Sequence, residues 1–336
     1  MITRTGRSTW RNSTHCAPTM IVCRAMPVIA RFDALQRDAL LAYPLMDFDR
    51  LMMIRRRADR LGLPMNYHGN DDLPPTGYEN TLEVLSPARP GGRIETLFRP
   101  PDDQFIGDID LHYDAEELLL SMPDAEGRWG VAELDLASGT LHRLPLIDEP
   151  DVHNYDACYL PDDRIIFTST APFIGVPCVG GTSKIANLYL LDHDQSIRRL
   201  TNDQDHNWCP TVLNDGRVLY QRWEYADIAH AFTRLLFSMN PDGSRQMEYY
   251  GSNSFWPTAM FYARPIPNHP TKVVAIVGGH HDPPRQGELV IFDPAPGRHE
   301  ADGVVQRIPG HGEMVMPVIL DGLNAASWPR FLHPFP

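Results

Sequence analysis

Two stretches of the chain hold histidine, aspartate and cysteine residues at matching places, and these residue types bind zinc in proteins. The first stretch contains Asp205, His206 and Cys209, and the second contains His153, Asp156 and Cys158. Because imidazole, carboxylate and thiolate groups from neighbouring loops can share one metal ion, the pattern predicts a zinc site. Its expected ligands are Asp205, His206, Cys209 and His153, with Cys158 as a further candidate.

The same side chains have a structural interpretation, which the sequence leaves open. Short polar residues before a strand can cap a turn or bond to the backbone of a neighbouring strand. Under this interpretation Trp208, Trp256 and Trp328 pack between neighbouring units of the fold. The histidines then serve the fold and bind no metal.

Two other places hold side chains capable of chemistry. Cys178 lies in a long loop of residues 173–181, and long loops on a rigid scaffold often carry function. Its thiol is either reactive or ligand-bound, or else an inert buried group or a disulfide partner. His280 and His281 follow a strand, where consecutive side chains point to opposite sides. One imidazole is therefore expected to line a channel and the other to face solvent.

The motifs of common enzymes are absent from the sequence. It contains no GxSxG, HExxH, P-loop or dinucleotide-binding fingerprint. It also contains no CxxCH, the motif that attaches c-type haem. With no complete catalytic motif, the catalytic residues stay unknown and the sequence leaves enzymatic activity open.

The charge and hydropathy of the chain exclude several classes of partner. The formal net charge of the 336 residues is −13, which argues against nucleic acid or an acidic membrane surface as the main partner. The sequence contains no run of about 18 apolar residues, so no transmembrane helix is expected. A small ligand or another protein domain is the expected partner.

The elements that position these residues repeat along the chain. The stretch from His153 to Phe167 returns as His206 to Tyr220, and positions 153 and 206 differ by 53. Units of about this length with about four short strands each are typical of β-propeller blades. In the second copy, a loop leads to a turn at residues 214–216 and then to a strand, which predicts a hairpin. We therefore expect an all-β fold, a β-propeller.

The number of repeats predicts an incomplete ring. Residues 80–336 contain four complete units and a fifth that lacks its returning strand. This pattern predicts propeller repeats that are truncated at the C-terminus. In the alternative, an early strand at residues 48–54 closes the ring. Both arrangements stay open at the level of sequence.

The N-terminal part has a different composition. Residues 1–31 contain no acidic side chain, and Arg24 interrupts their best apolar stretch, so no clear signal peptide is present. This segment is expected to be disordered or non-native. Residues 32–79 are expected to form a short helix at 32–42, a buried strand at 48–54 and a loop rich in proline, glycine and asparagine.

Several phrases, taken in order, resemble a known family. They are Asp156–Asp162, Gly175–Cys178, Asp203–Pro210, Met239–Gly243 and Gly251–Pro257. Together they resemble the middle domain of the hydrazine synthase alpha subunit, most of all in the large planctomycete-type proteins that share this domain. The turns also resemble TolB-like propeller repeats. The resemblance covers residues 32–336.

This resemblance implies a propeller fold and a periplasmic or other extracytoplasmic location. In hydrazine synthase itself it would also imply c-type haem and a nearby zinc, but this sequence has no CxxCH. Our first hypothesis is a binding or scaffold module of a larger extracytoplasmic protein, with other domains or subunits as partners and a small ligand in its channel. The alternative is part of a c-type haem-dependent oxidoreductase whose haem-binding region is absent from this chain.

Overall fold

The computed structural model describes residues 18–223, 234–251, 253–310 and 327–336, except for the side chains of residues 18–27, 45 and 178. The chain divides into two compact units. One comprises Met1–Met53 with Val84–Glu95, and the other comprises Ile54–Glu83 with Thr96–Pro336. The candidate residues all belong to the second unit.

The first unit contains one long helix, α1 (Pro18–Leu41). It begins before the expected start at residue 32, so part of the segment expected to be disordered is helical from residue 18. Residues 1–17 of that segment lie outside the described range. The described apolar side chains of α1, such as Phe32 and Leu35, are exposed. No described helix is both long and apolar enough to cross a membrane.

Short elements follow the helix. They are η1 (Pro44–Met46), β1 (Leu51–Arg55), η2 (Asn70–Asp72), β2 (Thr81–Ser86), β3 (Arg93–Phe98) and η3 (Pro101–Asp103). Strands β1, β2 and β3 form a three-stranded sheet in that order. The early strand expected at residues 48–54 corresponds to β1, which is only partly buried. It pairs with β2.

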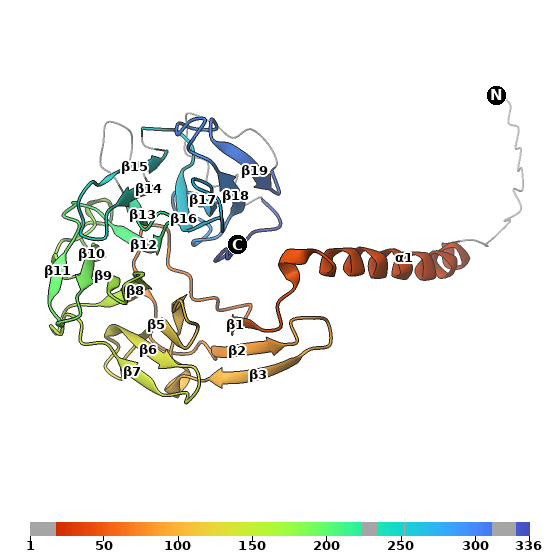
Figure 1. Cartoon of the computed structure of the whole chain (residues 1–336), viewed down its shortest axis with the longest axis horizontal. Coiled ribbons are helices and arrows are strands. Elements are labelled where there is room, and N and C mark those ends of the chain that lie inside the picture. The colour runs from red at the N-terminus through yellow and green to blue at the C-terminus, as the bar shows by residue number, and fades with distance from the viewer. Residues whose placement is uncertain (1–17, 224–233, 252, 311–326) are drawn as a thin grey trace, which may run out of the picture. The chain divides into compact units, whose positions relative to one another are not determined.

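The second unit is built from four successive antiparallel sets of four strands (Figure 1). Set 1 consists of β4 (Gly107–Leu111), β5 (Glu117–Pro123), β6 (Trp129–Asp135) and β7 (Leu141–Arg143). Set 2 consists of β8 (Asn154–Tyr159), β9 (Ile165–Ser169), β10 (Asn187–Leu191) and β11 (Ile197–Arg199), with η4 (Pro177–Val179) between β9 and β10.

Sets 3 and 4 continue the pattern. Set 3 consists of β12 (Asn207–Val212), β13 (Val218–Trp223), β14 (Arg234–Met239) and β15 (Met247–Tyr250). Set 4 consists of β16 (Ala259–Pro265), β17 (Val273–Gly278), β18 (Glu288–Phe292) and β19 (Val304–Ile308). One parallel bridge between Arg234 and Ala259 joins these two sets into a single eight-stranded sheet. None of the described sheets closes on itself.

The expected repeat units are out of phase with these sets. The sequence pattern placed the His-Asn phrases in loops, but Asn154 and Asn207 begin strands β8 and β12. Each set starts two strands earlier than the expected units, which began at the strands now identified as β6, β10, β14 and β18. The predicted hairpin is present as β12 and β13, with Gly216 at a φ of 84° in its turn. Glycine adopts this conformation without steric cost.

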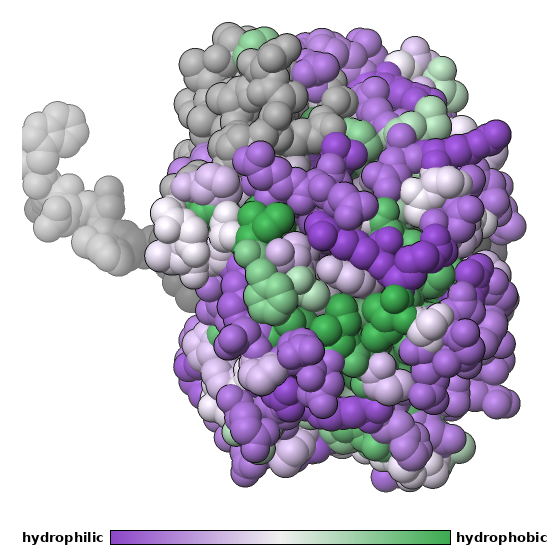
Figure 2. Space-filling model, turned by 90° about the vertical axis from the view of Figure 1, so that its left-hand side faces the viewer, coloured by the Kyte–Doolittle hydropathy of each residue, from purple (hydrophilic) through white to green (hydrophobic). Residues whose placement is uncertain are grey.

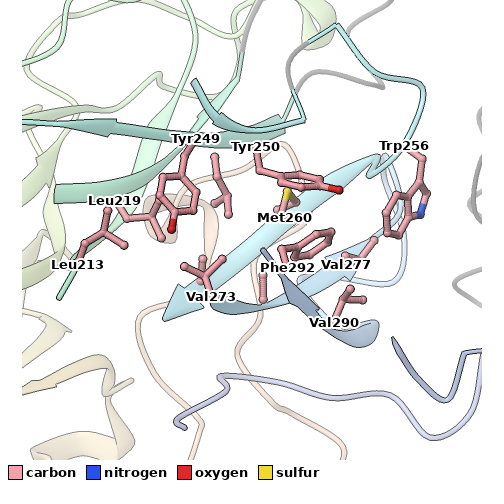
Figure 3. Close-up of a cluster of buried hydrophobic side chains, with 13 residues drawn as sticks. Leu213, Leu219, Tyr249, Tyr250, Trp256, Met260, Val273, Val277, Val290 and Phe292 are labelled. Atoms are coloured by element: carbon pink, nitrogen blue, oxygen red, sulfur yellow. The ribbon is translucent and has the colours of Figure 1, made fainter. Parts of the chain in front are cut away.

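The first strands of the sets, β4, β8, β12 and β16, contact one another from set to set. Between the sets lie buried hydrophobic clusters. In Figure 3, Leu219 of set 3 and Val273, Met260 and Phe292 of set 4 belong to one such cluster, with Tyr250 of β15. Because one four-stranded sheet cannot bury both of its faces alone, neighbouring sets stabilise each other.

Exposed large hydrophobic side chains of the second unit are spread over several segments, whereas several of those in the first unit lie on α1. Figure 2 shows a face on which hydrophilic residues predominate and hydrophobic residues lie between them. Large exposed hydrophobic side chains in the described ranges, such as Phe173, Met247 and Val305, belong to different segments. Scattered residues of this kind are normal for a protein surface. The polar centre of the second unit is the more informative feature.

Candidate binding site on the first strands

Each first strand contains one residue in the left-handed backbone region, at a place where its pairing with the next strand shifts. The four bulge residues are Asp108 (φ 46°), Asp156 (φ 51°), Cys209 (φ 52°) and Tyr262 (φ 52°). A β-bulge adds one unpaired residue and redirects its side chain. Non-glycine residues rarely adopt a positive φ. The recurrence of this geometry in four sets marks the first strands as the place to look for a site.

The bulge residues of neighbouring sets are connected. The backbone N–H of Cys209 donates to Oδ2 of Asp156 at 2.5 Å, and the N–H of Asp156 donates to Oγ of Ser121 at 2.7 Å. Burial raises the pKa of Asp156 to about 7, and the charge of Asp108 adds to the effect. Asp156 is therefore a carboxyl group that titrates near neutral pH.

A second polar position follows two residues after each bulge. The residues there are Asp110, Cys158, Thr211 and Arg264. Nη1 of Arg264 lies 2.9 Å from Oδ1 of Asp110 and donates to Oγ1 of Thr211 at 3.1 Å. This ion pair connects the first strand of set 4 with the first strand of set 1. Burial raises the pKa of Asp110, and the charge of Arg264 opposes that rise.

The loop of residues 61–78, here named the central segment, contacts all four sets. Asn70 donates to the carboxylate of Asp108 in set 1. Tyr155 of set 2 donates to Oδ1 of Asp71 at 3.3 Å. The backbone of Tyr67 interacts with His206 beside set 3.

In set 4, Nδ2 of Asn66 donates to the carbonyl of Gly279 at 2.8 Å. Burial raises the pKa of Asp71 to about 7, and the charge of Asp72 contributes. The central segment thus brings further titratable and hydrogen-bonding groups to the ends of the first strands.

Arg285 is a fully buried cation of this region. Its side chain is 1% exposed, and Nη2 donates to the carbonyl of His68 at 2.8 Å. The guanidinium lies over the ring of Trp208 at 4.9 Å, with Phe261 and Tyr262 also within reach. Aromatic faces attract a cation through their quadrupole. Among its described contacts, however, Arg285 has no ion pair with a carboxylate.

The two repeated histidines act as hydrogen-bond acceptors from the backbone. Nδ1 of His206 accepts from the N–H of Ala186 at 3.2 Å, and Nδ1 of His153 accepts from the N–H of Trp129 at 3.3 Å. Burial lowers the pKa of His153 to about 4 and that of His206 well below its usual value. A neutral ring that accepts at Nδ1 carries its proton on Nε2. In this state neither nitrogen is free to bind a metal.

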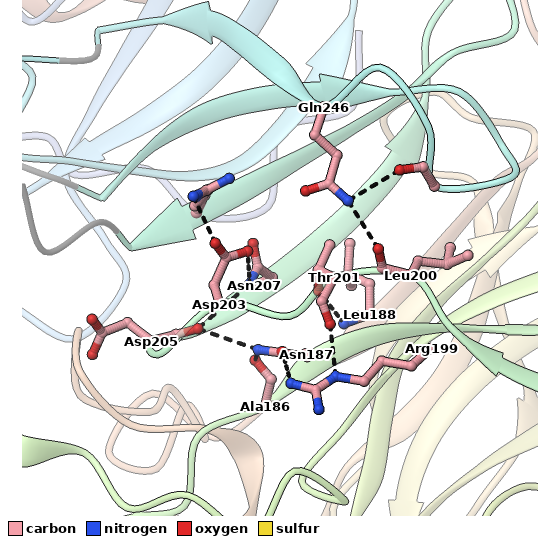
Figure 4. A network of polar contacts seen from close by, with 12 residues as sticks. Ala186, Asn187, Leu188, Arg199, Leu200, Thr201, Asp203, Asp205, Asn207 and Gln246 are labelled. Atoms are coloured by element: carbon pink, nitrogen blue, oxygen red, sulfur yellow. Dashed lines mark hydrogen bonds and ion pairs between the residues drawn. The ribbon is translucent and has the colours of Figure 1, made fainter.

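Asp205 is buried, and its carboxylate oxygens have no hydrogen-bond partner among the described residues. Figure 4 shows this side chain pointing away from Asn187 and Asn207, which donate to the Asp205 backbone carbonyl. Burial raises the pKa of Asp205 to about 7, with Arg234 opposing the shift and Asp203 adding to it. Nη1 of Arg234 lies 2.8 Å from Nδ1 of His280.

The structure places the other candidates as follows. His280 and His281 have ring centroids 3.9 Å apart, and Tyr67 of the central segment lies beside His281. His280 is half-buried and lies beside Arg234 of β14, whereas His281 is exposed and contacts Tyr67 of the central segment. Cys158 and Cys209 are buried free thiols, and burial raises the pKa of each. The side chain of Cys178 lies outside the described residues, although its backbone is in η4.

Within the described residues, no group of three or more histidine, cysteine, aspartate or glutamate side chains is arranged to hold a metal ion. The zinc site expected at Asp205, His206, Cys209 and His153 therefore stays a prediction. The backbone bonds of the two histidines favour their structural role.

Sequence reasoning missed several residues of the site. They are Asp108, Tyr262, Arg264 and Arg285, together with the polar side chains of the central segment. A signal was present for the first of them, because the phrase Asp-Ile-Asp at 108–110 precedes β5 as Asp-Ala-Cys at 156–158 precedes β9. Tyr262 and Arg285 share no residue type with the other copies, so no such signal existed for them.

The chain is similar to solved propeller structures. Hydrazine synthase from Kuenenia stuttgartiensis matches with a TM-score of 0.58 and 13% identity, over 75% of this chain and 38% of that chain. A protein assigned as TolB from Agrobacterium tumefaciens matches with a TM-score of 0.51 and 16% identity, over 78% of this chain and 90% of that chain. The chain has a TolB-like β-propeller fold.

At these identities the likeness shows the fold alone. The chain spans well under half of the hydrazine synthase chain that it matches. No protein-family model matches the sequence, and no curated protein matches it. The propeller prediction is confirmed, whereas the number of blades in a complete ring and the closure of that ring stay predictions. The function of the propeller has to be argued from its own side chains.

Proposed function

We propose that this chain is the β-propeller binding module of a larger extracytoplasmic protein and that it binds a small polar ligand at the ends of its first strands. One observation carries the proposal. Charged side chains from different sets, including Asp108, Asp110 and Arg264, gather there and keep partial exposure to solvent. Burying charges costs stability unless they are paired. Polar groups that converge in a partly open place are typical of a ligand site.

Binding is favoured over catalysis by the protonation states of the groups present. The thiols of Cys158 and Cys209 are buried, and burial raises the pKa of each, so neither is an activated nucleophile. The two histidines that accept from backbone N–H groups are held in place as structural residues. Asp156 titrates near neutral pH, but its Oδ2 is occupied by the N–H of Cys209. A ligand would be recognised here by charge and hydrogen bonds.

Hydrogen–deuterium exchange tests the location of binding. The full chain is screened by thermal shift against small carboxylates, phosphates, amines and neutral polar solutes at constant ionic strength. Any compound that stabilises the chain is then added for exchange measurements. We expect protection in β4, β8, β12 and β16, with little change in β7, β11, β15 and β19. Protection confined to the latter strands, or no stabilising compound in any class, contradicts the proposal.

The extracytoplasmic location is tested separately. Fractionation of the source cells should recover the protein outside the cytoplasm, in a complex or a chain larger than 38.0 kDa. Recovery as a free cytoplasmic chain would contradict this part of the proposal and leave the binding site unaffected.

A further inference from the structure

The charges of three arginine side chains from different segments act on one residue, His333. The imidazole of His333 lies against the ring of Tyr262, with centroids 4.1 Å apart. Nη1 of Arg285 donates to the hydroxyl of the same Tyr262 at 3.4 Å. Burial and, after it, the charges of Arg56, Arg285 and Arg264 lower the pKa of His333 to about 3. The ring is therefore neutral in a positively charged environment.

Two of these arginines have no compensating carboxylate within ion-pair distance among the described residues. Arg56 donates from Nη1 to the carbonyl of Leu61 at 2.9 Å and lies over the ring of Phe105 at 4.9 Å. Arg285 is held by the His68 carbonyl and by aromatic faces. Burial lowers the pKa of Arg56, which reflects the cost of its charge there. The charge of Asp108 acts on Arg56 and that of Asp156 acts on Arg285, but neither carboxylate forms an ion pair with its arginine among the described contacts. Both buried cations are therefore only partly compensated.

The position of His333 is accessible. His333 keeps solvent-exposed surface although atoms of the chain surround it, and Arg56, Tyr262 and Arg264 are partly exposed. The segment of residues 327–336 is attached near this place by two backbone hydrogen bonds between Phe331 and Gly287. Trp328 and Phe335 of that segment are 75% and 81% exposed. Phe331 also packs against the buried cluster that contains Trp208 and Phe261. The segment is therefore anchored at Phe331, and the described ring contact of His333 itself is with Tyr262.

We infer that the place of the His333 imidazole is an oxyanion-binding site, formed by Arg56 with Arg285 and Arg264, and that His333 occupies it when no ligand is bound. The inference rests on the proposed binding function and names its ligand class. Guanidinium groups recognise carboxylate and phosphate oxygens through directed N–H donors. Arg264 already binds Asp110 and Thr211, so Arg56 is the main free donor. A small carboxylate or phosphate displaces the imidazole.

Titration calorimetry with the full chain tests the inference. Sodium acetate and inorganic phosphate are the probes, at constant ionic strength with chloride as the background anion. We expect at least one of the two anions to bind saturably. The difference in affinity between acetate and phosphate shows whether the site prefers a planar carboxylate or a tetrahedral phosphate. Arg56→Gln should weaken that binding about tenfold or more, because a hydrogen bond to a charged group is lost.

A matched control is available on the outer strand β11. Arg198 donates from Nη1 to the carbonyl of Asp242 at 2.9 Å, as Arg56 does to that of Leu61. Arg198→Gln should leave anion binding unchanged. Equal loss in both variants would mean that only the overall charge matters, and it would overturn the inference.

Variants of His333 test the occupancy of the site. His333→Ala should tighten anion binding several-fold, because the competing side chain is removed. His333→Asp should abolish the binding and raise the melting temperature, because its carboxylate is a tethered anion. His333→Asn keeps a neutral polar side chain, and its binding should resemble that of the parent chain.

Two outcomes would overturn the inference. One is the absence of saturable acetate or phosphate binding in both the parent chain and His333→Ala. The other is destabilisation of the chain by His333→Asp relative to His333→Asn. If an amine or a neutral solute still protects the first strands from hydrogen exchange, the anion site is wrong while the proposed binding function stands.

Discussion

At the scale of single residues, the histidines that suggested a metal are held by backbone N–H groups. Ala186 lies just before β10, and its N–H would have no partner without Nδ1 of His206. His206 is also packed between the rings of Trp208 and Trp223. The hydrogen bond from Ala186 and the packing against the two tryptophans both fit a neutral imidazole ring, in agreement with the lowered pKa of His206. The imidazole is therefore a structural part of set 3.

We predict that His206→Ala lowers the free energy of unfolding by about 1–3 kcal/mol, because it leaves a buried N–H without an acceptor. Chemical denaturation measures this change, and His142→Ala on the exposed strand β7 is the control. Metal analysis of the same samples tests the zinc prediction. Near-stoichiometric zinc in the parent chain that is lost in His206→Ala would favour the metal site over the structural role.

Asp205 gives a second prediction, which concerns pH. Its pKa is raised to about 7 in the folded chain and is about 4 in an unfolded chain. Between these values the folded chain keeps a proton that the unfolded chain releases, so stability falls as pH rises from about 4 to 7. Asp205→Asn removes this titration and should reduce the slope by up to about 1.4 kcal/mol per pH unit.

Urea denaturation between pH 5 and 7 measures that slope. Asp242→Asn is the matched control, because hydrogen bonds from Ser244 lower the pKa of Asp242. A carboxyl of that kind contributes stability above its unfolded pKa and loses it in acid, so its removal cannot flatten the slope in this window. Parallel curves for Asp205→Asn and the parent chain would show that Asp205 does not titrate as described.

At the scale of the elements, the bulges of the first strands determine where side chains point. Cys209 has a φ of 52°, a conformation that β-branched residues strongly disfavour. We predict that Cys209→Val is less stable than Cys209→Ala by about 1–3 kcal/mol. At Cys158, outside the left-handed region in β8, valine should be at least as stable as alanine. Equal stability of both pairs in thermal denaturation would contradict the role of the bulge.

The sequence predicted the second, third and fourth strands of each set better than the first strands. Strands such as β10 and β17 are uninterrupted apolar runs, which the sequence pattern identifies directly. The first strands β8 and β12 contain asparagine, aspartate, cysteine or proline in place of a regular alternation. Their bulges break the two-residue period on which strand prediction depends. Because the site residues interrupt the regular alternation of polar and apolar side chains, the sequence pattern did not identify the strands that contain them.

The three tryptophans expected to pack between units also do not occupy equivalent places in the fold. Trp208 is fully buried in β12, where its counterparts in the other sets are Gly107, Tyr155 and Phe261. Trp256 lies before β16, and Trp328 is 75% exposed. Their likeness in sequence therefore did not correspond to equivalent places in the fold.

At the scale of the whole molecule, the ion pair of Arg264 and Asp110 connects β16 of set 4 with β4 of set 1. Sets 2 and 3 lie between these two strands in the sequence. Both side chains are largely buried, at 24% and 15% exposure. We predict a coupling energy of about 1–3 kcal/mol between Arg264→Gln and Asp110→Asn in a double-mutant cycle of unfolding. Arg128 and Asp148 form an exposed ion pair. The coupling energy between substitutions of these two residues should be less than about 1 kcal/mol.

The periodicity of the sequence identified the propeller because a repeat reports the fold of each unit. It could not identify contacts that occur once, such as Arg264 with Asp110 or Arg285 with the central segment. Arg285 has no equivalent in the other sets, and its partners in the central segment, Asn66 and His68, lie more than 200 residues away in the sequence. A contact of that kind leaves no pattern in a single sequence.

The central segment has a consequence for how the chain folds. It is synthesised before any of the four sets, yet Asn66 bonds to Gly279 and to the N–H of Arg285 in set 4. Sets 1 to 3 can assemble from neighbouring hairpins, but these bonds form only after nearly the whole chain has been made. Contacts of such high sequence separation slow folding. The bonds between the central segment and set 4 therefore cannot form before sets 1 to 3 have been synthesised.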